Sequence, residues 1–266
     1  MLINLFFLIF MLGASFASFI SVYIERGKDD RFFSSKNKSI CANCLRKLNY
    51  FELIPVFSFI FLRGKCRVCK TKIPTKLFIG EIILGLWFLG SFLFFLELEY
   101  GKIYFALSCL MGSIFYFLAL EDYENMEVST TFVYLFVALG IFTSISKFIL
   151  TGNYFAVFVP LLIISPFWLI YIVNKNYIGQ ADPYIYTALG LFFGTQFALS
   201  LFLYSVWIGA AFGIFYLKFI NKKFERGIRI PFLPIIFIAS IFILITNFHI
   251  IKIQDILFIN EFFFHK

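Results

Sequence analysis

The chain has 266 residues, of which 61% are hydrophobic and 14% are charged, and 42 of them are phenylalanine. A soluble fold cannot bury so much apolar surface, so this composition excludes a soluble globular protein and predicts a polytopic membrane protein. The formal net charge is +8, but no charge is spread along polar helices, so we expect membrane topology rather than nucleic-acid binding to explain it.

Eight apolar segments each approach the ~20 residues that cross a bilayer. They lie at about 2–24, 78–96, 103–120, 130–150, 155–173, 183–198, 199–218 and 232–250. Their apolar runs are continuous rather than alternating, which indicates helices and not a β-barrel. The sequence therefore predicts an all-α membrane protein with about eight transmembrane helices. Its expected parts are a first helix (1–24), a cytoplasmic loop domain (25–77) and a seven-helix membrane domain (78–266).

The loop 25–77 carries thirteen of the 23 Lys and Arg residues. Basic residues collect in the cytoplasmic loops of membrane proteins, so we expect this loop in the cytoplasm. With eight spans, the polar breaks 121–127 and 174–182 and the basic loop 221–229 fall on the same side.

Two aspartates stand at these polar breaks. Asp122 follows the apolar run 103–120, and Asp182 precedes the run that starts at 183. An ionisable residue at a helix end in the bilayer is a functional candidate. Two carboxyl groups on one membrane face can share a proton, so that one accepts a proton from water while the other polarises a carbonyl.

Histidine chemistry is poorly supported by comparison. The two histidines, His249 and His265, lie near the C-terminus. They provide no HExxH metalloprotease motif and little prospect of a Ser-His-Asp triad near the breaks.

Four cysteines in the loop form two Cys-x2-Cys pairs, Cys41 with Cys44 and Cys66 with Cys69, separated by 21 residues. This pattern is typical of a tetrahedral structural Zn²⁺ site, in which the metal contributes folding energy to a small loop. Disulfides are the alternative, and a reducing cytoplasm disfavours them. Cys109 stands alone in an apolar run and is interpreted as a packing residue.

The segment 51–62 is apolar but has only twelve residues and contains Pro55. It is too short to span a bilayer. Two interpretations stay open: an interfacial or re-entrant segment that contacts membrane lipid, or a small hydrophobic core for the loop.

Several motifs together resemble one family. The stretch IPVFSFIFLRGKCRVC at 54–69, followed by Ile73-Pro74 and Glu81, resembles the cytoplasmic loop of type IV prepilin peptidases. Residues 18–26 resemble the exit of that family's first span, with Ser21 where Asn is common. Residues 229–234 resemble the stretch that leads into its last span. The resemblance covers nearly the whole chain, in the same order.

The resemblance implies a Gly-x-Gly-Asp aspartic peptidase of the bacterial cytoplasmic (inner) membrane, with Asp122 and Asp182 as its catalytic aspartates. Such enzymes cleave the basic leader from prepilin-like precursors of type IV pilus, secretion or competence systems. Many also N-methylate the new N-terminus with S-adenosylmethionine, and Glu81 falls on an acidic position connected with that reaction. The sequence contains no Gly-rich Rossmann fingerprint for this cofactor, so the methyltransferase prediction depends on the resemblance alone.

Acidic residues next to Asp122 suit such a substrate. Glu121, Glu124 and Glu127 flank it and can attract a basic leader electrostatically. A solvated acidic loop is the alternative interpretation. Glu81, too, has another interpretation, as an ion-pair partner of Lys76 or Arg63.

The chain also departs from the family pattern. Ala181 replaces the second Gly before Asp182, Pro183 and Tyr184 follow it where the family has an apolar residue and Lys, and Ser129-Thr130 replaces Pro-Asp. Pro183 in the first turn of a helix is consistent with Asp182 as its N-cap. These departures leave open a weakened member, or a zinc-clasped scaffold or transporter whose aspartates relay protons.

Overall fold

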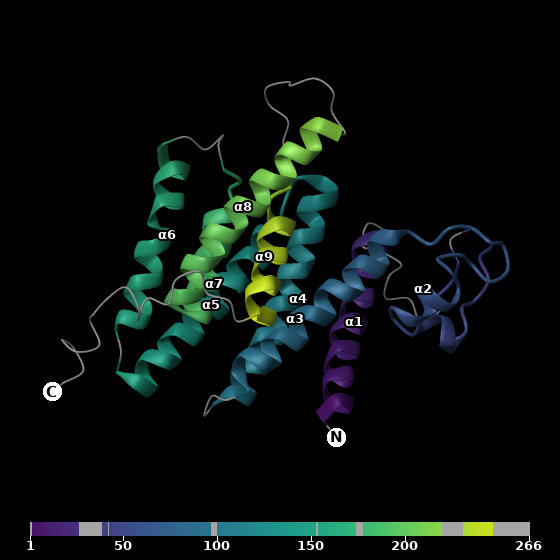
Figure 1. Ribbon diagram of the computed structural model, residues 1–266, viewed down its shortest axis with the longest axis horizontal. Helices are drawn as coiled ribbons and strands as arrows, with labels where there is room; N and C mark the ends of the chain where they lie inside the picture. Colours follow the sequence, from purple (N-terminus) through teal and green to yellow (C-terminus); the bar gives the residue numbers. More distant parts are fainter. Residues whose placement is uncertain are drawn as a thin grey trace. The chain divides into compact units, whose positions relative to one another are not determined.

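The computed structural model describes residues 2–26, 39–41, 43–96, 100–152, 154–173, 178–219 and 231–246. In this part of the chain the secondary structure is helical apart from two isolated β-bridges, which confirms the all-α prediction. In chain order the helices are α1 (Leu2–Arg26), the 3-10 helix η1 (Tyr50–Leu53), α2 (Phe57–Phe61), α3 (Thr75–Phe95), α4 (Gly101–Asn125), α5 (Thr130–Thr151), α6 (Phe155–Val173), α7 (Asp182–Phe193), α8 (Thr195–Phe219) and α9 (Leu233–Thr246). Figure 1 labels α1 to α9.

Each of the eight predicted apolar segments contains a helix. Helices α1, α3, α4, α5 and α8 are long and apolar enough to cross a membrane, whereas α6 and α9 contain shorter apolar stretches. Helix α7 has 12 residues, which is too short to cross a bilayer alone. The predicted boundary at 198/199 is wrong, because Gly194, with φ +99°, ends α7 and α8 begins at the next residue. That backbone conformation favours glycine, so the break falls there.

The chain divides into two compact units, Met1–Phe117 and Leu118–Lys266. In the first unit, α1 packs along α3. A Cβ atom added at Gly13 would lie 2.6 Å from the carbonyl oxygen of Leu84, so the two backbones need a glycine to approach this closely. Helix α3 is joined to α4 by the Trp87 indole, which donates to the carbonyl of Ser108 at 2.9 Å.

In the second unit, α7 is the most buried helix and packs against α5, α6 and α8. A Cβ atom at Gly140 would lie 2.7 Å from the carbonyl oxygen of Ala188, so the backbones of α5 and α7 touch. At the other end of α7, the Lys147 ammonium donates to the carbonyl of Phe192. Figure 1 shows α8 and α9 side by side, as their contacts require.

Several expectations concern residues outside the described part of the chain. These are the basic residues of 27–38, the start of the 174–182 break, the basic loop 221–229, and both histidines.

Candidate active site and metal centre

Asp122 lies in the last turn of α4 and is half-buried. Its Oδ2 accepts a hydrogen bond of 3.0 Å from the backbone N–H of Leu233, the first residue of α9. The first N–H groups of a helix lack intrahelical partners and carry partial positive charge, so they suit a carboxylate. The first turn of α9 therefore binds the Asp122 carboxylate, although the two are distant in sequence.

Asp182 is the first residue of α7 and only 5% exposed. Its Oδ2 accepts a hydrogen bond of 3.1 Å from the N–H of Gly179. The expected N-cap role of Asp182 is wrong, because the Ile185 N–H bonds to the carbonyl of Ala181 and the helix starts one residue earlier. The carboxylate is thus turned back over the preceding loop. Pro183 does lie in the first turn, as expected.

The departure from the Gly-x-Gly-Asp pattern has a simple backbone explanation. Ala181 has φ −79° and ψ −27°, an ordinary right-handed conformation that does not need glycine. Gly179 differs, because a Cβ atom there would lie 3.0 Å from Oδ2 of Asp182. Gly179, the first glycine of the motif, therefore leaves room for the Asp182 carboxylate, whereas the second position accepts the methyl group of Ala181.

Both aspartates belong to the second compact unit. They are close enough for the charge of Asp122 to act on Asp182. The end of α4 and the beginnings of α7 and α9 thus converge, and each carboxylate receives a hydrogen bond from the backbone. Such a pair can share one proton, with one member charged and the other neutral. We call it the aspartate site.

The four loop cysteines also converge. Their sulfur atoms all lie within 4.8 Å of one another, and those of Cys41 and Cys69 are 3.8 Å apart. All four are free thiols, so the structure does not support the disulfide alternative. Zn–S bonds of about 2.3 Å in a tetrahedron put sulfur atoms about 3.8 Å apart, so the cluster has dimensions that fit a metal ion.

The two Cys-x2-Cys turns repeat one backbone design. An isolated β-bridge brackets each turn, Ile40 with Lys47 and Lys65 with Lys72. In each turn the residue after the second cysteine has positive φ, 56° at Leu45 and 58° at Lys70. That residue's N–H bonds back to the carbonyl of the first cysteine. The repeat directs two sulfurs from each turn toward one point.

The thiols differ in how readily they ionise. Hydrogen bonds from the hydroxyl and backbone N–H of Thr71 lower the pKa of Cys69 to about 5. The N–H groups of Cys69 and Val68 lower the pKa of Cys66. The N–H of Arg46 acts to lower the pKa of Cys44, but burial and the neighbouring sulfurs outweigh it and raise that pKa to about 11. Four adjacent thiolates repel one another, and a bound cation removes that repulsion.

Two family models match this chain. A model of the bacterial peptidase A24 N-terminal domain matches residues 11–95, and a model of the type IV leader peptidase family matches residues 109–214. The chain belongs to the type IV leader peptidase family. With its apolar helices, membership makes it a multi-pass protein of the inner membrane.

Relatives of this family member are about one-quarter identical to it over the aligned residues. A protein of Vibrio cholerae serotype O1 is 26% identical over 212 residues, covering 76% of this chain and 81% of its own length. One from Pseudomonas putida is 28% identical over 226 residues (79% and 73%), and one from Bacillus subtilis is 24% identical over 215 residues (77% and 79%). All three are named prepilin leader peptidase/N-methyltransferase. No solved structure matches this chain.

In this member of the family, aromatic side chains to which the sequence analysis gave no role fix α7 beside the aspartate site. The Trp168 indole of α6 donates to the Thr187 hydroxyl at 3.0 Å, and its ring lies 4.9 Å from that of Tyr184. Tyr186 stacks on Phe167 of α6 at 4.1 Å. Tyr186 lies four residues after Asp182 and so on the same face of α7, and this spacing could have marked it in the sequence as a neighbour of the aspartate.

The acidic neighbours of Asp122 have different roles. Glu121 accepts hydrogen bonds from the N–H and the hydroxyl of Ser129, at 3.0 and 2.8 Å, and so fixes the start of α5. Glu124 and Glu127 are exposed. The expected attraction of a basic leader therefore concerns these two residues rather than Glu121.

Glu81 lies in the first compact unit, where its Oε2 accepts a hydrogen bond of 2.6 Å from the N–H of Val56. Glu81 as a whole is 9% exposed. Of its expected ion-pair partners, Lys76 lies 3.0 Å from Glu25. The carboxylate of Glu81 holds the loop, and its connection with methylation stays a prediction.

Proposed function

We propose that the chain is a membrane aspartic endopeptidase that removes the basic leader from type IV prepilin-like precursors at the cytoplasmic membrane face and then N-methylates the new N-terminus. The observation that carries the peptidase proposal is the convergence of Asp122 and Asp182, each anchored by a backbone N–H at a helix end. Family membership supports leader cleavage, and the names of the relatives support methylation.

The proposed reaction uses the two carboxyl groups in opposite states. Asp122, which faces the first turn of α9, is the better placed to carry the charge and to accept a proton from the attacking water. Asp182, buried at the start of α7, then holds the shared proton and donates a hydrogen bond to the scissile carbonyl. Water adds to that carbonyl, and the tetrahedral intermediate collapses as a proton passes to the leaving amine.

The proposed substrate combines a basic leader with an apolar helix. The aspartate site lies at helix ends, where a leader can remain in water while the apolar helix stays in the bilayer. Glu124 and Glu127 are exposed in the same turn and the loop that follows it, and their charge is complementary to the leader.

The proposed cofactors are a structural Zn²⁺ held by Cys41, Cys44, Cys66 and Cys69, and S-adenosylmethionine as methyl donor. The sulfur cluster fits a tetrahedral ion, which would hold the two turns of the loop together. Methyl transfer is supported by the relatives' names alone, and Glu81 is the candidate residue near that reaction.

Isosteric substitutions test the peptidase proposal. Asp122→Asn and Asp182→Asn, in purified full-length protein in liposomes, should each lower the rate of leader removal from a pilin-like precursor by about 10²- to 10⁴-fold, the usual contribution of an acid or base. Glu25→Gln, which removes an exposed carboxylate of the first compact unit, serves as the control. Cleavage that survives either aspartate change, in a correctly folded variant, rules out the aspartic mechanism.

A further inference from the structure

A short segment of the first unit exposes large apolar side chains. It comprises η1, the turn 54–56 and α2, that is, Tyr50–Phe61, and we call it the wedge. Phe51 is 77% exposed, Ile60 55% and Phe61 80%. This grouping does not suit a small hydrophobic core of the loop, because a core would bury these side chains.

The wedge lies beside the membrane-spanning helices rather than beyond their ends. The Phe57 ring is 5.8 Å from that of Phe7. Phe7 precedes the last residue of α1, Arg26, by 19 positions, or about 28 Å at 1.5 Å per residue. The Phe59 ring stacks at 4.5 Å on Phe78 in the first turn of α3. These contacts place α2 alongside α1 and α3, where lipid surrounds spanning helices.

A buried hydrogen bond fixes the turn of the wedge. Val56 has φ +64° and ψ −54°, which is unfavourable for a β-branched residue. Its N–H donates to the carboxylate of Glu81, and both residues are buried. A strained turn held in this way gives α2 a defined direction relative to α3.

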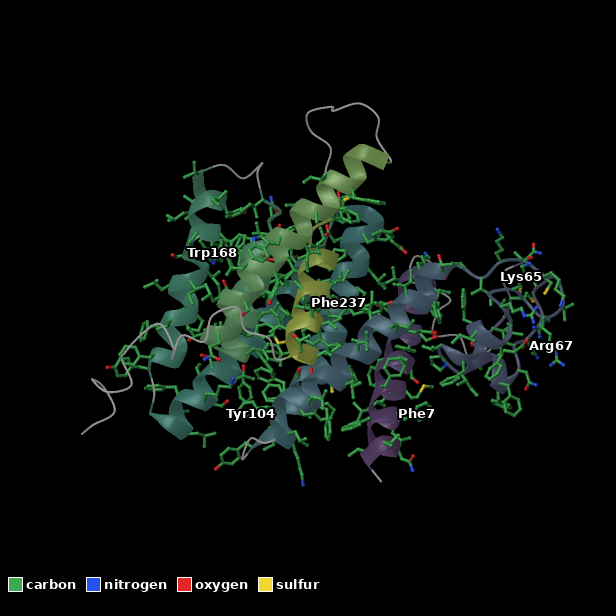
Figure 2. The ribbon with its side chains drawn as sticks, in the orientation of Figure 1. Phe7, Lys65, Arg67, Tyr104, Trp168 and Phe237 are labelled. Atoms are coloured by element: carbon green, nitrogen blue, oxygen red, sulfur yellow. The ribbon has the colours of Figure 1, made fainter. Side chains whose placement is uncertain are left out.

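Basic side chains follow the wedge directly. Five exposed cations lie within eleven residues after Phe61: Arg63, Lys65, Arg67, Lys70 and Lys72. Glu52 is the one acidic residue of the wedge, and its Oε1 forms an ion pair with the Arg46 guanidinium at 2.5 Å. Figure 2 shows Lys65 and Arg67 at the periphery of the loop. The surface next to the exposed rings is therefore positively charged.

We propose that the wedge is inserted among the membrane lipids beside α1 and α3, and that the adjacent cations bind phosphate headgroups of anionic lipids. Phe51, Ile60 and Phe61 contact acyl chains, and Arg63, Lys65 and Arg67 contact headgroups. Apolar contact and charge attraction together account for such interfacial binding. The membrane thereby becomes a structural partner of the cysteine loop, independently of the reaction at the aspartate site.

Photo-crosslinking in the full-length protein tests lipid contact. A benzophenone amino acid replaces Phe61 in one variant and Val68, which is 65% exposed on the same loop, in the matched control. Both proteins are reconstituted in nanodiscs, irradiated and analysed by mass spectrometry. We expect lipid adducts at position 61 in several-fold higher yield than at position 68.

Hydrogen exchange tests the headgroup contact. In wild-type protein, peptides covering 50–62 should exchange several-fold more slowly in nanodiscs with phosphatidylglycerol than in phosphatidylcholine alone. The triple change Arg63→Glu, Lys65→Glu and Arg67→Glu should abolish this difference. Lys102→Glu, an exposed change in another segment, should preserve it.

Three results would overturn the proposal. The first is equal lipid labelling at positions 61 and 68. The second is adducts of position 61 with protein, which would assign the exposed rings to a second copy of the chain or to another segment. The third is slow exchange that is independent of anionic lipid, which would reject the headgroup contact.

Discussion

A substitution at Gly140, where α5 contacts α7, should displace the aspartate site from a distance. In Gly140→Ala, the new Cβ atom would lie 2.7 Å from the Ala188 carbonyl oxygen and 2.8 Å from its Cα. Both are backbone atoms, so no side-chain rotation relieves the clash. Reaching ordinary contact at about 3.4 Å requires the helices to separate by roughly 0.7 Å, and overpacking of this kind costs about 1–3 kcal/mol.

That displacement is transmitted to Asp182, because Ala188 lies in the same 12-residue helix. A catalytic group misplaced by about 1 Å can lose about 10²-fold in rate. We therefore expect Gly140→Ala to lower kcat/KM for leader removal by about 10- to 100-fold. The assay uses purified full-length protein in liposomes with a pilin-like precursor, normalised to folded protein by a thermal unfolding curve.

Ala138→Ser is the matched control, since it adds one atom on an exposed face of the same helix. It should keep wild-type rates and Tm. Gly140→Ala with wild-type kcat/KM and wild-type Tm would refute the argument, because the helix contact would then be loose. A lowered Tm with unchanged kcat/KM would show that α7 moves without disturbing Asp182.

Three further predictions concern the motif, the metal and the loop. Gly179→Ala should lower the rate of leader removal by about 10-fold or more, because the new methyl group crowds the Asp182 carboxylate. Ala181→Gly should leave the rate within about twofold of wild type. A Gly179→Ala enzyme with the wild-type rate would contradict this prediction. Cys44→Ser should lose bound zinc, measured by mass spectrometry of the purified protein, and Cys109→Ser should retain it; equal metal contents would exclude the four-sulfur site. A hydrogen bond from Arg46 lowers the pKa of Glu52. The charged carboxylate therefore stabilises the folded loop at any pH above the ordinary pKa of Glu, and this stabilisation is lost as the pH falls through the lowered pKa. Glu52→Gln should therefore accelerate hydrogen exchange of peptides 46–53 at pH 7, and a difference that persists unchanged into acid would show another cause.

The sequence predicted the helices well because long apolar runs leave few alternatives in a bilayer. It located the end of α7 poorly, since both sides of Gly194 are apolar and only the positive φ of that residue marks the break. It also misassigned Asp182 as an N-cap. The N-cap is the residue whose carbonyl accepts the first hydrogen bond of the helix, and the sequence alone does not determine which of two neighbouring residues that is.

The candidate sites were predictable to different depths. The four cysteines follow from spacing, because metal ligands impose it. Leu233 could not be recognised as a contact of Asp122, since a backbone N–H has no signature of its own. Likewise, the role of Glu81 in holding Val56 depends on a strained turn, which only coordinates reveal.

The hydrogen bond between Asp122 and the first residue of α9 also bears on when the protein becomes competent during biosynthesis. A ribosome-bound chain that has emerged only as far as α8 already contains both acidic residues but lacks the group that orients one of them. If Asp122 acts as proposed, we expect leader cleavage to begin only after α9 has emerged and docked.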